Sequence, residues 1–272
     1  MGNQPQVSFI TPAFNRPKEL KSAIYSCLSQ TIDDWEIVVV DDHSDKANLK
    51  DIVYSFKDKR IRYIHQETGK KGEASGRQTA IENAESNILI TLDSDDINYP
   101  QRAARCLEIL NSSAPKLLYT RVLHFSASNP VGKKKSILQP YNQRLLEMVN
   151  FITNPGTAFN RSAYDEAGAF YSQDLMLATD YDQFLRMSHA GVNTFCLDEI
   201  HVCYRKHKDA VTAGNLNKLH QAIMKVRIKN SIQPFSLEEI TDYALPELQS
   251  AILNNKQQRS LWVDDRWEAK NQ

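Results

Sequence analysis

Two acidic clusters are the part of this sequence best suited to chemistry. The pair Asp41-Asp42 follows the strand-like run 36–40, and Asp93-Ser94-Asp95-Asp96 follows the apolar run 87–92. If the two runs are neighbouring strands, their carboxylates converge on one crevice, where each close pair repels by about 1–4 kcal/mol. A hard divalent cation removes that repulsion, since Mg²⁺ or Mn²⁺ is typically held by one or two carboxylates together with substrate phosphates. The clusters therefore predict a metal-bridged phosphate ligand such as a nucleotide, and the alternative is that Asp simply favours turns after strands.

The glycine-rich loops that bind phosphate through backbone N–H groups are missing from the sequence. It contains neither GxGxxG nor GxxxxGK[ST], and residues 69–72 are only weakly similar to them. Phosphate binding then has to come from a metal and from cationic side chains. Arg77, at the start of a predicted helix, is the candidate cation.

The order of predicted elements places these clusters in an α/β fold. Short β-rich runs alternate with helical patterns through residues 7–124, which indicates a mostly parallel sheet flanked by helices. We expect strands at 7–11, 36–40, 61–64, 87–92 and 116–124, and helices at 18–30, 49–56, 77–84 and 100–110. The second half is less regular, with a polar loop at 126–140 and helices at 181–190, 216–231 and, as a pair, within 235–267.

The composition excludes several classes of protein. The 272 residues are 41% hydrophobic and 24% charged, which is ordinary for a globular chain. Lys+Arg and Asp+Glu both number 33, so the basic footprint of a nucleic-acid-binding protein is missing. No apolar run approaches the ~20 residues of a membrane span, and the N-terminus does not resemble a signal peptide. Four scattered cysteines form no CxxC pair, so we expect a protein of the reducing cytoplasm.

Short motifs, in the same order along the chain, resemble those of the inverting family 2 glycosyltransferases of the GT-A fold. The resemblance covers about residues 7–208. It rests on Thr11-Pro12-Ala13-Phe14-Asn15-Arg16, Val40-Asp41-Asp42-His43-Ser44, Gly76-Arg77-Gln78, Leu92-Asp93-Ser94-Asp95-Asp96, Thr179-Asp180-Tyr181-Asp182-Gln183-Phe184-Leu185-Arg186 and Tyr204-Arg205-Lys206-His207. It implies transfer of a sugar from a nucleotide-diphosphate donor to a hydroxyl acceptor, with inversion at the anomeric carbon.

The resemblance also implies a role for particular residues. Asp180 would be the general base that deprotonates the acceptor hydroxyl. Asp95, with Asp93 and His207, would hold Mn²⁺ or Mg²⁺ on the donor diphosphate. The donor would be a UDP-sugar by default, in a pocket formed by Pro12, Phe14, Asn15, Asp42, Arg77, Asp93, Ser94 and Asp95.

Some positions depart from the family pattern or have another explanation. The Glu that usually precedes the base is Thr179 here, so one neighbour that organises the acceptor pocket is lost. Asp180 could instead cap the helix that follows it, and His207 could be a solvated side chain. Phe14 could belong to the core, and Arg186 is expected to form a structural ion pair.

The resemblance suggests a division of the chain into parts. We expect a GT-A domain at 1–210, in which 1–125 binds the nucleotide sugar and 126–210 binds a saccharide or lipid-linked acceptor. Residues 211–272 would be a helical extension that serves as a lid, a homo-oligomer contact or a peripheral contact with the inner face of the plasma membrane.

The expected pathway is bacterial surface polysaccharide synthesis. Two alternatives stay open: a nucleotidyltransferase that uses the same acidic crevice, and a catalytically silent nucleotide- or sugar-binding domain.

Overall fold

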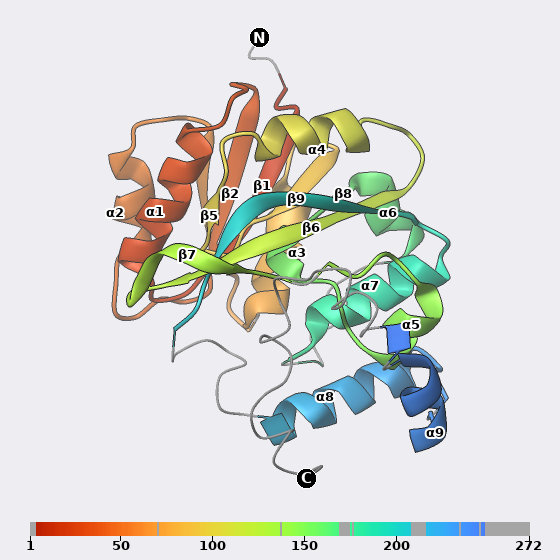
Figure 1. Cartoon of the computed structure of the whole chain (residues 1–272). Coiled ribbons are helices and arrows are strands. Elements are labelled where there is room, and N and C mark those ends of the chain that lie inside the picture. The colour runs from red at the N-terminus through yellow and green to blue at the C-terminus, as the bar shows by residue number, and fades with distance from the viewer. Residues whose placement is uncertain are drawn as a thin grey trace.

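The computed structural model describes residues 4–69, 71–136, 138–168, 175, 177–207, 216–233, 235–244 and 246–247. Its centre is a curled sheet with helices on both sides (Figure 1). The expected α/β fold class is confirmed. The strands lie in the order β3-β2-β1-β4-β8-β6-β9-β5, with β7 paired to β6.

The first half of the sheet is parallel. The strands β1 (Val7–Ala13), β2 (Trp35–Asp41), β3 (Ile61–His65) and β4 (Ile88–Thr91) alternate with the helices α1 (Pro17–Leu28), α2 (Leu49–Ser55) and α3 (Glu73–Asn83). β1 pairs with β2 on one side and with β4 on the other. The strand order therefore reverses at β1, and ligands of open α/β sheets bind beyond the carboxyl ends of strands at such a point.

The two strands that end in acidic clusters, β2 and β4, are not neighbours. The condition that they are neighbours is not met, because β1 lies between them. A run of β-branched residues identifies a buried strand, but it carries no information on which strand lies next to it. Both carboxyl ends nevertheless lie on the same edge of the sheet, since all three strands are parallel.

The second half of the sheet is mixed. The edge strand β5 (Ile97–Asn98) is antiparallel to β9 (Asn193–Arg205), which runs parallel to β6 (Lys116–Ser126). β8 (Thr157–Asn160) is antiparallel to both β4 and β6. The predicted loop at 126–140 is wrong over β7 (Asn129–Lys135), because backbone pairing with β6 makes this polar segment the second strand of a hairpin.

Helices cover the two faces of the sheet around two separate cores. Successive strand residues alternate between them: Val38 and Val40 belong to one core, and Ile37 and Val39 to the other. The first core also contains residues of α3, α5 (Gln143–Met148), α6 (Arg161–Glu166), α7 (Thr179–His189) and α8 (Leu216–Lys229). The second contains residues of α1, α2 and α4 (Arg102–Leu110).

The C-terminal segment is described only in part. The amphipathic helix expected at 216–231 is α8, which lies beneath α7 in Figure 1. Of the helices expected within 235–267, the described residues contain the short helix α9 (Leu237–Glu239) and a π-helical turn, Ile240–Ala244. Residues 248–272 lie outside the described part of the chain.

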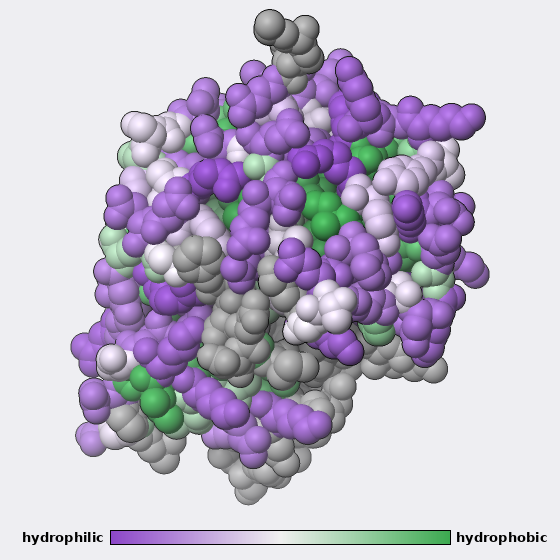
Figure 2. All heavy atoms as spheres, turned by 180° about the vertical axis from the view of Figure 1, so that it is seen from behind, coloured by the Kyte–Doolittle hydropathy of each residue, from purple (hydrophilic) through white to green (hydrophobic). Residues whose placement is uncertain are grey.

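The surface seen from behind is mostly hydrophilic, with small apolar patches (Figure 2). Large apolar side chains that are exposed, such as Phe14, Tyr54 and Ile228, come from distant parts of the sequence. Over the described ranges, none of the helices combines the length and the apolar content needed to cross a bilayer.

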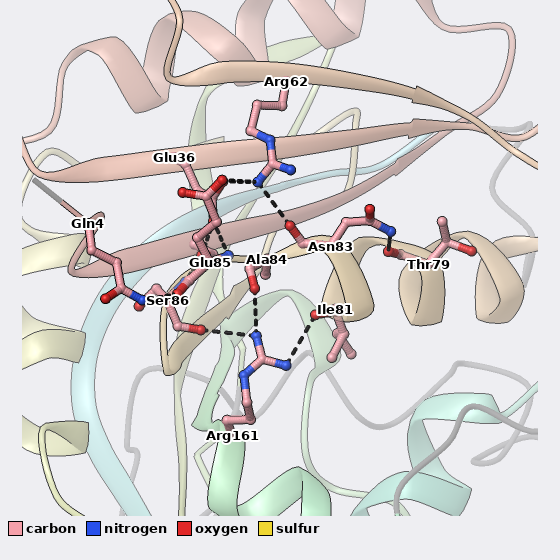
Figure 3. Close-up of polar contacts among 11 residues, drawn as sticks. Gln4, Glu36, Arg62, Thr79, Ile81, Asn83, Ala84, Glu85, Ser86 and Arg161 are labelled. Atoms are coloured by element: carbon pink, nitrogen blue, oxygen red, sulfur yellow. Dashed lines mark hydrogen bonds and ion pairs between the residues drawn. The ribbon is translucent and has the colours of Figure 1, made fainter. Parts of the chain in front are cut away.

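A polar network fixes the edge of the sheet at the amino ends of the parallel strands (Figure 3). Glu36, only 3% exposed, accepts hydrogen bonds at 2.6 Å each from Arg62, the Ser8 hydroxyl and the Glu85 backbone N–H. Arg161 donates to the carbonyl groups of Ala84 at 2.8 Å and Ser86 at 3.1 Å. These bonds fix the segment between the end of α3 and the start of β4. Because the strands β1, β2 and β4 are parallel, their carboxyl ends all lie at the opposite edge of the sheet.

Candidate active site

The loop after β4 carries the second acidic cluster, and each of its three carboxylates contacts a hydrogen-bond donor of this chain. Asp93 Oδ1 accepts a hydrogen bond of 2.8 Å from Arg77. Asp95 Oδ2 lies 2.9 Å from His207 Nε2 and also contacts the Arg16 guanidinium. Asp96, fully buried, accepts a 2.8 Å hydrogen bond from the backbone N–H of Arg205. Each of these carboxylates is therefore bound by a group of this chain itself, through side chains for Asp93 and Asp95 and through the backbone for Asp96.

The end of β9 is hydrogen-bonded to this loop. Arg205 Nε donates to the backbone carbonyl of Asp95 at 2.7 Å, while the Arg205 N–H binds Asp96. Burial, and then the nearby charge of Asp93, raise the pKa of Asp96 well above its usual range. These hydrogen bonds bring His207 to 2.9 Å from Asp95. The two residues predicted to share a metal ion therefore lie side by side, although they are distant in the sequence.

Arg77 lies inside α3, which begins at Glu73 rather than at Arg77 as expected. Its side chain is buried and contacts both Asp93 and Glu73. The helix passes close to β1 at the preceding residue, where a Cβ on Gly76 would make a tight contact of 3.2 Å with Pro12 Cβ. The close approach of α3 to β1 thus places the predicted cation beside the acidic loop.

Asp180 lies in the first turn of α7 and faces the same charges. Burial raises the pKa of its carboxyl group, the Tyr181 backbone N–H and Arg77 lower it, and Asp93 raises it. The alternative that Asp180 only caps α7 is wrong, because the cap position is occupied by Ala178. Asp180 is therefore a half-buried carboxyl group near the Arg77–Asp93 pair, with its pKa displaced toward neutrality.

The first acidic cluster has different partners. Asp41 accepts hydrogen bonds from the Tyr63 hydroxyl at 2.9 Å and the Ser44 backbone N–H at 3.0 Å. Asp42 accepts from the Gly72 backbone N–H at 2.8 Å, and burial raises its pKa. The carboxylates after β2 thus have hydrogen-bond partners that differ from those of the loop after β4.

The remaining residues predicted to form the nucleotide-sugar pocket lie at the end of β1 and after β4. Asn15 accepts hydrogen bonds from the backbone N–H groups of Asp45 at 3.1 Å and Lys46 at 2.9 Å, which joins the loops after β1 and β2. Pro12 and Ser94 are buried. Phe14 is 51% exposed, so the alternative that it belongs to the core is wrong.

The side chains of the site could bind a divalent metal ion only if a bound substrate supplied the remaining metal ligands. No group of three or more His, Cys, Asp or Glu side chains is arranged to hold a metal ion within the described ranges. Asp95 and His207 do lie within hydrogen-bond distance of one another. Mg²⁺ and Mn²⁺ are usually bound by one or two carboxylates with phosphates and water, so this pair suits a metal that arrives with a diphosphate.

The sequence matches the model described as "Glycosyl transferase family 2" over residues 8–175. The chain belongs to glycosyl transferase family 2. Among its family 2 relatives is WcaA of Escherichia coli strain K12, a glycosyl transferase assigned to colanic acid biosynthesis. It is 30% identical over 196 residues, which cover 69% of this chain and 67% of WcaA.

A second relative is the Escherichia coli UDP-Glc:alpha-D-GlcNAc-diphosphoundecaprenol beta-1,3-glucosyltransferase WfgD. It is 32% identical over 127 residues, which are 47% of this chain and 49% of WfgD. The chain thus spans about two thirds of the length of WcaA and about half of WfgD, and only 17% of a glycosyltransferase from Rickettsia felis.

Two solved structures show the same fold. Staphylococcus aureus TarS 1-349 in complex with UDP-GlcNAc superposes with a TM-score of 0.66 at 16% identity, covering 96% of this chain and 78% of TarS 1-349. The mannosyltransferase PcManGT from Pyrobaculum calidifontis, in complex with GDP-Man and Mn²⁺, has a TM-score of 0.60 at 15% identity, covering 95% of this chain and 77% of PcManGT. The expected GT-A fold is confirmed.

Three charged residues of the site were not among those expected from the sequence. Arg16 and Arg205 lie within the motifs that revealed the family, but their pairing with the loop after β4 is a long-range contact. Glu73 had no signal beyond its spacing of four residues from Arg77, which is a common helical ion-pair spacing.

Proposed function

We propose that this protein is a metal-dependent inverting glycosyltransferase that moves a sugar from a UDP-sugar to a hydroxyl group of a saccharide or lipid-linked acceptor. The observation that carries the proposal is the position of Asp180, half-buried and near the Arg77–Asp93 pair at the carboxyl edge of the sheet. UDP is supported by the UDP-GlcNAc complex of TarS and by the UDP-glucose donor named for WfgD.

The proposed reaction needs a base on the acceptor side. The acceptor hydroxyl transfers its proton to the Asp180 carboxylate as its oxygen attacks the anomeric carbon. The bond from that carbon to the diphosphate oxygen breaks, and UDP leaves with the electron pair. A positioned carboxylate of raised pKa contributes about 10²–10⁴-fold to such a step.

On the donor side, positive charge stabilises the leaving diphosphate. A divalent cation, when bound, would be held by Asp95 and His207, with Asp93 nearby, and would supply part of that charge. Arg77 and Arg16 already contact the same carboxylates. The nucleoside would lie over the ends of β1 and β2, in a pocket formed by Pro12, Phe14, Asn15, Asp42 and Ser94.

The proposed setting is surface polysaccharide synthesis at the cytoplasmic side of the membrane. Polysaccharide synthesis is supported by the colanic acid pathway named for WcaA, and a lipid-linked acceptor by the diphosphoundecaprenol named for WfgD. The proposed division keeps residues 1–125 for the donor and 126–210 for the acceptor. The extension 211–272 then serves oligomerisation or a peripheral membrane contact.

The test is transfer by wild-type protein and by Asp180→Asn, followed as UDP release from UDP-glucose or UDP-N-acetylglucosamine with Mn²⁺. The acceptor is an N-acetylglucosaminyl diphospholipid. We expect Asp180→Asn to bind UDP with unchanged affinity and to release UDP at least ~100-fold more slowly. The matched control is Asp165→Asn, an exposed position on α6 that should behave as wild type. Wild-type rates in Asp180→Asn would contradict the assignment of the base.

A further inference from the structure

The helix that carries Asp180 holds a second carboxylate with a different environment. Asp182 has no exposed side-chain surface and lies one half-turn after Asp180 in α7. A carboxylate removed from water is costly unless cations and hydrogen-bond donors compensate it. The partners of Asp182 therefore show what this position does.

Those partners come from two helices. Within α7, Arg186 Nε donates to Asp182 Oδ2 at 3.1 Å, so the ion pair expected for Arg186 is present. From the end of α8, Lys229 Nζ donates to Oδ2 at 3.1 Å, and Asn230 Nδ2 donates to Oδ1 at 2.9 Å. We define this contact of Asp182 with Lys229 and Asn230 as the α7–α8 clamp.

Helix α8 packs as part of the main core. Val226 has no exposed surface and belongs to the core that contains Tyr181 and Phe184 of α7. The Tyr181 hydroxyl in turn donates to the carbonyl groups of Leu146 at 2.7 Å and Glu147 at 2.9 Å, both in α5. The first turns of α7 are thus held by α5 on one side and by α8 on the other.

The entry to α7 is strained, which explains why it needs support. Ala178 has a φ of 58°, in the left-handed region that costs about 1–2 kcal/mol for a residue with a Cβ. Such a conformation persists when the surrounding structure enforces it, and it is frequent at functional sites. The Asp182 N–H donates to the Ala178 carbonyl at 3.1 Å, so the clamped residue also makes the first helical hydrogen bond after the strained one.

We propose that Asp182 is a positioning residue through which helix α8 fixes the first turn of α7 and thereby the carboxylate of Asp180. The proposal rests on the proposed role of Asp180 as the base. It gives part of the C-terminal segment a supporting role for the helix that carries Asp180, since Lys229 and Asn230 lie beyond residue 210. A buried ion pair adds little stability compared with apolar side chains of equal volume, so orientation is what this one contributes.

The test changes the α8 side of the clamp, because Asp182 itself is buried and its loss could unfold the protein. Lys229→Met and Asn230→Ala are combined, with Lys225→Met, an exposed position on the same helix, as the matched control. We expect kcat for UDP release from the UDP-sugar to fall about 10-fold, since small displacements of a catalytic group cost up to ~100-fold. The KM for the donor should stay within about twofold, because the donor contacts lie on the sheet edge. Amide hydrogen exchange should accelerate in residues 179–183 and not in β1 or β4.

Four outcomes separate the alternatives. Lys229→Arg keeps the charge, so it should retain the wild-type kcat and exchange. Unchanged exchange at 179–183 in the double variant would overturn the clamp, and faster exchange with unchanged kcat would overturn its positioning role. If the wild-type protein itself transfers no sugar, the proposed function fails, whereas the exchange measurement still decides whether the clamp holds α7.

Discussion

The two edges of the sheet both carry paired acidic and basic side chains, but they use them differently. At the amino edge, Arg161 donates to backbone carbonyl groups, and Glu36 accepts from the Glu85 backbone N–H as well as from the side chains of Ser8 and Arg62 (Figure 3). At the carboxyl edge, Asp93 and Asp95 pair with the side chains of Arg77, Arg16 and His207. Pairs of side chains can exchange partners when a charged ligand arrives, so the first edge suits stability and the second suits binding.

The largest expected effect would test the amino edge. Glu36→Ala leaves the Ser8 hydroxyl and the Glu85 N–H without their acceptor, and each donor left unpaired in the interior costs about 1–3 kcal/mol. We expect chemical denaturation to show this loss in the free energy of unfolding. In the fraction that stays folded, calorimetry should give a wild-type dissociation constant for UDP with Mn²⁺. A loss of UDP affinity larger than that of stability would contradict the division between the edges.

The next effect would test the carboxyl edge. Asp95→Ala removes the carboxylate that faces His207, so Mn²⁺ should no longer strengthen UDP binding, a loss of about 100-fold in affinity. Titration of UDP with and without Mn²⁺ measures it. Stability should change by less than about 1 kcal/mol, since Arg16 and His207 are partly exposed and can be solvated. UDP affinity that keeps its Mn²⁺ dependence would refute the metal role of Asp95.

The pH dependence should distinguish Asp180 from an ordinary exposed aspartate. Burial is the largest cause of its raised pKa, and the base is active only when deprotonated. The rate of transfer should therefore fall as pH falls through the pKa of Asp180 in the folded protein, above the ~3.9 typical of Asp. A profile of kcat/KM against pH tests this. An acid limb at the usual Asp value, or one that persists in Asp180→Asn, would contradict the assignment.

The part of this picture that follows from local sequence is the parallel half of the fold and the residue types at its edge. Runs such as 36–40 mark buried strands because β-branching and termination by Asp are local signals. The position of β1 between β2 and β4 has no such signal, and β7 was missed because backbone pairing, not side-chain type, makes it a strand.

Asp182 shows the same limit at the level of a single residue. Its spacing from Arg186 is typical of a solvated helical ion pair. It is buried here, and a second cation that it binds, Lys229, lies 47 residues later in the chain. Long-range packing thus decides whether a carboxylate in a familiar motif faces solvent, a ligand or another helix.

The smallest expected effect concerns an exposed residue at the carboxyl edge that contributes little to the stability of the fold. Phe14 follows β1 at the carboxyl edge and is 51% exposed, so Phe14→Ala should change the free energy of unfolding by less than about 0.5 kcal/mol. If its ring covers the nucleobase, UDP affinity should fall about 5–10-fold, the lower end of what stacking of a base on an aromatic side chain contributes. Calorimetry with UDP measures the fall, and Tyr54→Ala, at an aromatic side chain of similar exposure (55%) on α2, is the control that should leave affinity unchanged. Equal effects of the two substitutions would mean that exposed rings on this half of the protein are equivalent, and that Phe14 has no special relation to the donor.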